Sequence, residues 1–180
     1  MQKYFEKIPG ERLFLSPENP EDYALYVKWL NDPAVAISAD GYWKSFSLPR
    51  MEREMREADS DSQSYAIVLR EGERLIGNIA LKDVDQRNGR AELGMFIGEE
   101  ADRGCGYGAE AIRLLLHYAF TTLRLHSVQG VVLSSNAQSL ACCEKIGFQV
   151  TGRRRESAFQ EGAFVDEIYM DILDREFLAR

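Results

Sequence analysis

The fold is decided by two linked stretches, Ala91-Glu92-Leu93-Gly94-Met95-Phe96-Ile97-Gly98 and Arg103-Gly104-Cys105-Gly106-Tyr107-Gly108-Ala109, with five residues between Ile97 and Arg103. The first is typical of a strand. Beyond the second, apolar residues recur at a spacing that predicts one buried helix face: Ile112, Leu115, Leu116, Ala119, Phe120 and Leu123. We therefore predict a strand, a glycine-rich loop that breaks the sheet, and a long helix.

The glycine-rich loop has the chemistry of an anion site. Glycines allow backbone N–H groups to approach a ligand closely, and a helix start adds the positive end of its dipole. Arg103 would add a charge-assisted contact, so the loop predicts a pyrophosphate site. A P-loop is excluded because no Gly-Lys-Ser or Gly-Lys-Thr follows.

Two other interpretations of this loop stay open. Gly104, Gly106 and Ala109 superficially fit a dinucleotide-binding fingerprint, but that motif needs a βαβ unit and a carboxylate about twenty residues on, where the chain has Gln129. The second alternative is a glycine-rich helix start that binds no ligand.

Upstream, an antiparallel meander precedes the decisive strand. From Tyr65 the period changes to two, with Tyr65, Ile67 and Leu69 at alternate positions of a strand. Glu71-Gly72-Glu73 forms a turn, and residues 75–84 continue as a second strand. Asn88-Gly89 is a pair favoured in tight hairpin turns, and it leads into the strand of residues 91–97.

The first part of the chain predicts a short strand and two helices. Residues 12–15 form the strand, and the first helix has the apolar face Tyr23, Tyr26, Val27 and Leu30. The second helix is marked by Leu48, Met51, Met55 and Ala58. Between them, Tyr42 and Trp43 lie in an irregular aromatic stretch that is either a lid over a pocket or a staple between the helices.

Downstream, residues 128–133 predict a strand and residues 136–146 a helix. A last hairpin turns near Glu161-Gly162, with Ile168, Met170 and Ile172 alternating on its second strand. The whole pattern is α+β, with a mixed sheet and packed helices, and we expect one domain over residues 1–180.

Composition narrows the function classes. The net charge of -7 argues against electrostatic binding of nucleic acid or of an anionic membrane. Three cysteines cannot form a disulfide framework, and the opening residues lack the apolar run of a signal peptide, so we expect a reducing, cytoplasmic location. His117 and His126 combine with no cysteine at a metal-ligand spacing, so we expect no metal.

The ordered motifs resemble the GCN5-related N-acetyltransferases (GNAT). Arg103, Gly106 and Gly108 fill the family's coenzyme-loop pattern of Arg or Gln, two residues, Gly, one residue, then Gly or Ala. The resemblance extends over nearly all of the chain after Tyr65, through Asn136-Ala137-Gln138-Ser139 and Glu144-Lys145-Ile146-Gly147-Phe148. The late Gly152-Arg153 and Asp166-Glu167 stretches look like the branch that includes ribosomal-protein N-terminal (RimJ/RimL-type) and spermidine acetyltransferases.

The resemblance implies a fold and a cofactor. The expected fold is a single GNAT-like domain whose mixed, mostly antiparallel sheet splays into a V between helices on both faces. Acetyl-CoA would be the co-substrate, with its pantetheine arm beside residues 93–97. The implied coenzyme-binding residues are Phe96, Ile97, Arg103, Gly104, Cys105, Gly106, Tyr107, Gly108, Ala109 and Asn136. Asn136 is equally suited to cap a helix, and the two roles are compatible.

The resemblance also suggests catalytic residues. Glu92 lies on the strand leading to the thioester, where relatives often place a carboxylate that withdraws the amine proton through water. Its alternatives are a solvated strand residue or a partner for Arg90. Where many relatives have a tyrosine that protonates the leaving thiolate, this chain has Cys143, which is either that acid or part of the core.

The expected activity is direct transfer of the acetyl group to an amine within a ternary complex. The leading acceptor is a protein or peptide N-terminal α-amine, admitted between Tyr42-Trp43 and the last hairpin. A polyamine or other small amine is the alternative. Two further classes stay open: a coenzyme A-binding regulatory module without turnover, and an enzyme of a nucleotide other than coenzyme A. The chain would act as a monomer or homodimer, with no nucleic acid or membrane partner.

Overall fold

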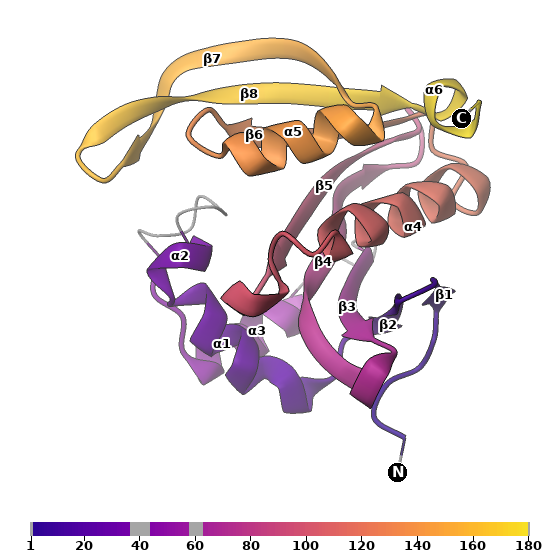
Figure 1. The fold of residues 1–180 in the computed structure, drawn as a ribbon, viewed down its shortest axis with the longest axis vertical. Helices are drawn as coiled ribbons and strands as arrows, with labels where there is room; N and C mark the ends of the chain where they lie inside the picture. Colours follow the sequence, from indigo (N-terminus) through magenta and orange to yellow (C-terminus); the bar gives the residue numbers. More distant parts are fainter. Residues whose placement is uncertain (1, 37–43, 58–62, 180) are drawn as a thin grey trace.

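The computed structural model describes residues 2–36, 44–57 and 63–179. Its sheet has eight strands in the order β1-β2-β3-β4-β5-β6-β8-β7 (Figure 1). The strands are β1 Ile8–Pro9, β2 Leu13–Pro17, β3 Gln63–Leu69, β4 Arg74–Asp85, β5 Arg90–Ile97, β6 Ser127–Leu133, β7 Gln149–Gln160 and β8 Ala163–Leu173. The helices are α1 Tyr23–Leu30, α2 Pro33–Ala36, α3 Leu48–Glu57, α4 Tyr107–Thr121, α5 Ala137–Ile146 and α6 Asp174–Leu178, with 3₁₀ turns η1 Pro20–Asp22, η2 Glu71–Glu73 and η3 Glu100–Asp102.

The sheet opens into a V between β5 and β6. These two strands are the parallel neighbours, and every other neighbouring pair is antiparallel. Their pairing ends after three positions, at Glu92 opposite Gln129. Beyond that point β5 continues beside β4 and β6 continues beside β8, so the two strands diverge. The predicted mixed, mostly antiparallel and splayed sheet is confirmed.

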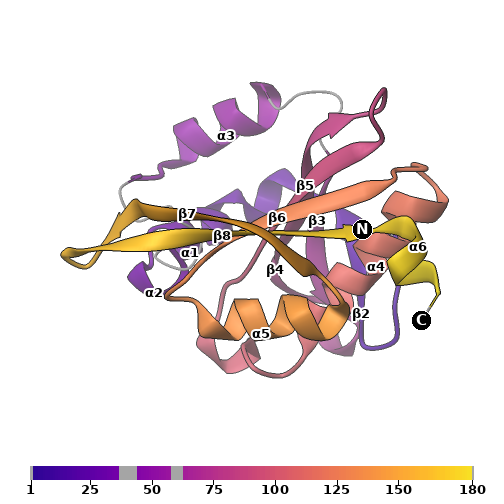
Figure 2. The same ribbon diagram turned by 90° about the horizontal axis from the view of Figure 1, so that it is seen from above.

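Helices cover both faces of the sheet, as predicted. Figure 2 shows α3 on one side of the strands and α5 on the other. One buried cluster joins the apolar face of α4 to β3, β4 and β5, and includes Leu115, Leu116 and Ala119. A second cluster lies on the opposite face, where Tyr26, Trp29 and Met51 from α1 and α3 pack on the sheet. In β3, consecutive residues 65–69 are therefore all buried, and the alternation seen in the sequence separates two covered faces.

The predicted apolar face of α1 is confirmed but was incomplete. Tyr26 is buried, and Tyr23, Val27 and Leu30 are half-buried against the same cluster, but the sequence spacing left out Trp29. The fully buried residues are Tyr26 and Trp29, whose rings pack against each other and against Phe96 of β5. Gly98 leaves room for the indole, because a Cβ there would lie 2.1 Å from the Trp29 ring. The end of β5 packs closely against α1, and this contact makes Tyr26 and Trp29 the most deeply buried residues of the helix.

The remaining elements differ from the sequence predictions mainly at short pieces. Strand β1 and helices α2 and α6 were not predicted, and each has five residues or fewer. The hairpins at Asn88-Gly89 and Glu161-Gly162 are confirmed, with Gly89 and Gly162 in the left-handed region at φ 64° and 88°. Within the described ranges, no helix combines the length and apolar character that crossing a membrane requires.

Candidate active site

The glycine-rich loop joins β5 to α4, as the sequence predicted. Gly104 and Gly106 have φ of 74° and 81°, a left-handed conformation that glycine adopts without penalty. Gly106 is the residue immediately before α4, and no side chain caps the helix there. Gly108 packs closely, because a Cβ would lie 3.2 Å from Cε of Met95. Each glycine of the loop thus has a backbone or packing reason.

The backbone N–H groups of residues 104–109 are free of partners in the described part of the chain, whereas that of Arg103 donates to the Glu100 carbonyl. The free groups belong to the loop and to the first turn of a 15-residue helix, whose leading N–H groups have no partner within the helix. Unpaired donors at the positive end of a helix dipole favour an anion. This arrangement has the chemistry that the sequence predicted for a pyrophosphate site.

Arg103 is directed towards the end of β5. Its Nε donates to the Ile97 carbonyl at 3.2 Å and its Nη2 to the Gly98 carbonyl at 2.7 Å. These bonds tie the loop to the strand that precedes it. The expected contact between Arg103 and a diphosphate stays a prediction. It would be made by the guanidinium N–H groups that do not take part in these two hydrogen bonds.

Sequence reasoning missed Arg12, which reaches the loop from the start of the chain. Its Nη1 donates to the Cys105 carbonyl at 3.0 Å, and its guanidinium lies over the Tyr107 ring, 4.8 Å from the centroid. Its Nε and its backbone N donate to the two carboxylate oxygens of Glu110, each at 2.8 Å. Burial raises the pKa of Glu110, but these hydrogen bonds and the Arg12 charge outweigh it and hold that pKa below its ordinary value.

The free edge of β5 runs along the V. Residues 93–97 pair with β4 on one side, and no strand of the described ranges pairs with them on the other, where β6 has turned away. A Cβ added to Gly130 of β6 would lie 3.8 Å from the Leu93 carbonyl oxygen and would meet no other described residue within 4 Å beyond its chain neighbours. Phe96 packs its ring on Tyr26 and Trp29, so its predicted coenzyme contact is left to its backbone. An extended ligand arm can pair with this edge through main-chain groups.

Glu92 lies at the vertex of the V, on the sheet face opposite α4. It is half-buried, and Gln129 Nε2 of β6 lies 3.5 Å from its Oε2. Lys82 of β4 is its direct neighbour on the other side. The suggested pairing of Glu92 with Arg90 is wrong, because Arg90 lies 3.3 Å from Asp85 instead. Among the described residues, the other carboxylate oxygen of Glu92 therefore has no hydrogen-bond partner, and it lies close to the point where the strands part.

Cys143 packs against the α4-side core from α5. Burial is the main cause that raises the pKa of its thiol to about 11, with smaller contributions from Cys142 and Glu144. A thiol with this pKa keeps its proton at neutral pH. It is a poor donor to a coenzyme A thiolate, whose own pKa lies near the ordinary thiol value of about 8.5. Its predicted role as acid stays a prediction, and its environment favours the packing role.

Replacing Cys143 with Ala is expected to change kcat by less than about threefold, because the thiol is a weak acid in the folded protein. A folded-state pKa above the unfolded value of about 8.5 contributes stability that is full below that pH and lost as pH rises towards 11. Urea unfolding of both proteins at pH 7 and pH 10.5 should therefore show the stability of the wild type declining relative to the variant. A fall in kcat of a hundredfold would instead identify Cys143 as the acid.

Asn136 caps α5. Its Oδ1 accepts a hydrogen bond from the Ser139 backbone N–H at 3.0 Å, which confirms the capping role. It follows β6 by three residues, at the open end of the V, and its predicted coenzyme contact stays a prediction. The predicted acceptor-binding residues Tyr42 and Trp43 lie outside the described residues.

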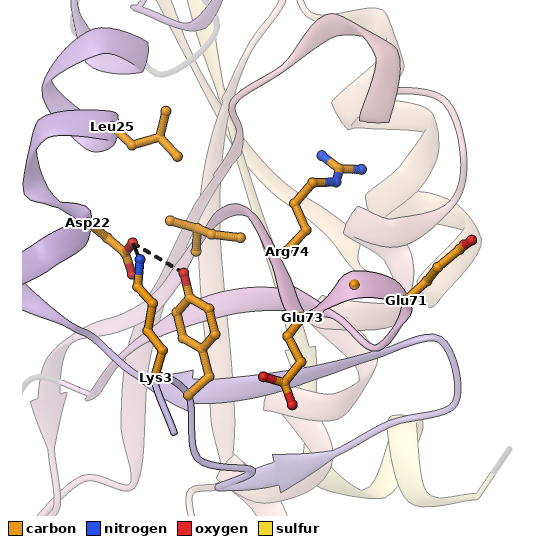
Figure 3. Close-up of a pocket in the computed structure, with 9 residues that line it drawn as sticks. Lys3, Asp22, Leu25, Glu71, Glu73 and Arg74 are labelled. Atoms are coloured by element: carbon orange, nitrogen blue, oxygen red, sulfur yellow. Dashed lines mark hydrogen bonds and ion pairs between the residues drawn. The ribbon is translucent and has the colours of Figure 1, made fainter. Parts of the chain in front are cut away.

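One cavity in the described part of the chain contains none of the predicted site residues (Figure 3). It measures about 700 Å³ and lies between the N-terminal segment, α1 and the turn before β4. Asp22 lies at its wall, where it accepts hydrogen bonds from Lys3 and from the Tyr4 hydroxyl. Both contacts go to Asp22 Oδ1, while the buried Oδ2 has no hydrogen-bond partner among the described residues. Because none of the residues of the sequence motifs lines this cavity, the candidate site is the V and the loop.

Comparison with known proteins adds independent findings. Residues 12–149 match the family described as the acetyltransferase (GNAT) domain. The chain is 28% identical over 178 residues to an uncharacterized N-acetyltransferase, p20, of Bacillus licheniformis, covering 96% of this chain and 98% of that protein. It is 33% identical over 150 residues to a putative ribosomal N-acetyltransferase, YdaF, of Bacillus subtilis, covering 83% and 79%. A spermidine N-acetyltransferase from Vibrio cholerae, crystallised with CoA and spermine, superposes with a TM-score of 0.85 at 22% identity, covering 94% and 99%.

Proposed function

The chain belongs to the GNAT acetyltransferase family and is an acetyl-CoA-dependent N-acetyltransferase, and from that premise we propose that its acceptor is the N-terminal α-amine of a protein or peptide. The proposal has three parts: where the coenzyme binds, which residue takes the proton, and which amine enters. The curated relatives at comparable identity include a putative ribosomal N-acetyltransferase and spermidine acetyltransferases, so the choice of amine depends on the site itself.

The coenzyme binds across the V. Its diphosphate lies on the free N–H groups of residues 104–109, and its pantetheine arm pairs with the free edge of β5 at residues 93–97, which include Phe96 and Ile97. The observation that supports this is geometric. The loop and the free edge are consecutive in the chain, so one extended ligand can contact both and reach the vertex with its thioester.

The amine attacks the thioester at the vertex of the V. The amine nitrogen forms a bond to the thioester carbon, the C–S bond then breaks, and coenzyme A leaves as a thiolate. The amine proton passes to Glu92, directly or through one water, because the free Glu92 oxygen lies where the strands part. Coenzyme A thiolate is a tolerable leaving group near neutral pH, so the step does not require Cys143 as an acid.

Lys82 carries the choice of an α-amine over a polyamine. It lies directly across from Glu92, and its Nζ is 3.3 Å from where a Cβ on Gly94 would be. The Lys82 ammonium group therefore lies beside Gly94, in the middle of β5 and close to the expected position of the thioester. It repels an acceptor with several positive charges. An α-amine is disfavoured less. Its pKa of about 8 means that deprotonation at pH 7 costs ~1.4 kcal/mol, against ~4.6 kcal/mol for a lysine-like amine.

A panel of amines tests the proposal. Release of coenzyme A thiol is measured with acetyl-CoA and three acceptors: a peptide with a free N-terminus, the same peptide blocked at its N-terminus but carrying lysine, and spermidine. The free N-terminus should give a kcat/KM at least tenfold above the other two. In Lys82→Met, which removes the positive charge, spermidine should gain on the peptide.

Two results would overturn the proposal. A wild-type preference for spermidine would make the protein a polyamine acetyltransferase. Tight binding of acetyl-CoA with no thiol release from any amine in a broader panel would favour the regulatory-module alternative.

A further inference from the structure

We propose that Arg12 is a positioning residue for the coenzyme: it turns the peptide between Cys105 and Gly106 so that the Gly106 N–H faces the diphosphate. This inference rests on the proposal that residues 104–109 bind that diphosphate. Arg12 lies 93 residues before Cys105 and 98 before Glu110, so no local pattern links it to the loop.

The first step is the hydrogen bond from Arg12 Nη1 to the Cys105 carbonyl, at 3.0 Å. In a trans peptide the C=O and the following N–H point in opposite directions. Because Arg12 holds the Cys105 oxygen towards itself, the Gly106 N–H must point away from Arg12. It then joins the other free N–H groups of the loop on the side open to a ligand.

The second step is that the guanidinium is fixed in position and plane. Two donors of Arg12, its backbone N and its Nε, bind the two oxygens of Glu110 at 2.8 Å each. The Tyr107 ring lies against the guanidinium at 4.8 Å. Nη2 lies 3.4 Å from where a Cβ on Gly106 would be, so the loop and the guanidinium fill the same small space. A lysine has one charged nitrogen and cannot reproduce this set of contacts.

The third step is electrostatic. Glu110 lies in the first turn of α4, close to where the diphosphate is expected, and the net effect of its surroundings is to lower its pKa, so it is ionised at neutral pH. An uncompensated carboxylate at that point would repel the diphosphate. Arg12 neutralises it while leaving the helix N-terminus open to the anion. Loss of Arg12 therefore weakens coenzyme binding through both the loop shape and the charge.

The test compares acetyl-CoA with S-acetyl-pantetheine, which has the thioester and the arm but no diphosphate. In Arg12→Lys and Arg12→Gln, the KM for acetyl-CoA should rise about tenfold or more while kcat changes less than twofold. The kcat/KM for S-acetyl-pantetheine should stay within twofold of wild type. The dissociation constant of coenzyme A, measured by calorimetry without any acceptor, should rise in parallel.

Arg50→Lys is a matched control. Arg50 also donates to a backbone carbonyl, Ser45 at 2.8 Å, and to a carboxylate, Glu54 at 2.7 Å, and it lies 4.7 Å from the Phe46 ring. It sits on α3, outside the coenzyme site, so its replacement should leave coenzyme A binding unchanged. A generic loss of arginine contacts would affect both variants alike.

The outcomes separate the two proposals. If the wild type uses S-acetyl-pantetheine as well as acetyl-CoA, the diphosphate site itself is wrong. If the wild type prefers acetyl-CoA but either folded Arg12 variant keeps that preference, the positioning role of Arg12 is overturned. Thermal melts of each variant establish which of them are folded.

Discussion

Replacing Glu92 with Gln is expected to lower kcat/KM about a hundredfold for a lysine-like amine and roughly tenfold for an α-amine at pH 7. Gln has the same shape but cannot accept the proton, and general-base catalysis contributes ~10²–10⁴-fold. The loss is larger for the amine with the higher pKa because more of it is protonated at the start. The dissociation constant of coenzyme A should not change, since Glu92 lies at the vertex of the V and not on the loop.

The pH dependence distinguishes a base from a structural residue. For an α-amine of pKa about 8, raising the pH to 9 supplies neutral amine from solution, so the rates of Glu92→Gln and wild type should converge. Asp171 is the matched control, because it lies on the same face of the sheet, across β6 from Glu92 and directly opposite Gln129. Asp171→Asn should keep its rate within about twofold. A Glu92→Gln enzyme that retains a third or more of the activity at pH 7 would exclude Glu92 as the base.

Replacing Gly106 with Val is expected to weaken coenzyme A binding roughly 30-fold to 100-fold. The backbone at Gly106 has φ of 81°, which costs an L-residue ~1–2 kcal/mol and a β-branched one more. The added Cβ would lie 3.4 Å from Arg12 Nη2, which is an ordinary van der Waals contact, so the strain comes from the backbone. If the loop rearranges to relieve that strain, its N–H groups no longer converge. A loss of ~2–3 kcal/mol in binding corresponds to the expected change.

Gly72 is the matched control, because it has a similar left-handed backbone conformation but lies outside the expected coenzyme site. It has φ of 73° in the turn between β3 and β4, and a Cβ there would meet nothing within 4 Å. Gly72→Val should therefore lose a similar amount of stability in urea but bind coenzyme A within twofold of wild type. Calorimetry on both variants measures the difference. Equal binding by Gly106→Val and Gly72→Val would contradict a diphosphate site at the loop.

Much of the fold could be predicted from local pattern. The apolar spacing of residues 112–120 predicts α4, the turn residues Asn88-Gly89 and Glu161-Gly162 predict two hairpins, and Asn136 predicts a helix cap. These features depend on backbone preferences and periodicities within a few residues. The splay between β5 and β6 was predicted only from the family resemblance, because neither Glu92 nor Gln129 is a residue type that indicates the end of strand pairing.

The candidate site was predictable in its loop and less so in its surroundings. The free N–H groups of residues 104–109 follow from glycine and helix-start chemistry. The direction of Arg103 does not, since it depends on how the loop folds back on the end of β5. The contact of Arg12 and the position of Lys82 opposite Glu92 do not either, since each depends on which elements pack side by side. The acceptor role of Tyr42 and Trp43 remains a prediction of the sequence.

By itself, the order of residues determined where this chain turns, caps and coils, because glycine, asparagine and apolar spacing act through the backbone over a few positions. Only the tertiary structure decided where the charges point. Arg12 meets Cys105 and Glu110 only because β2 and α4 pack together, and Lys82 faces Glu92 only because β4 and β5 pair in one register. Electrostatic and hydrogen-bonding partners are chosen by distance in space, and that distance is set when the two cores close around the sheet.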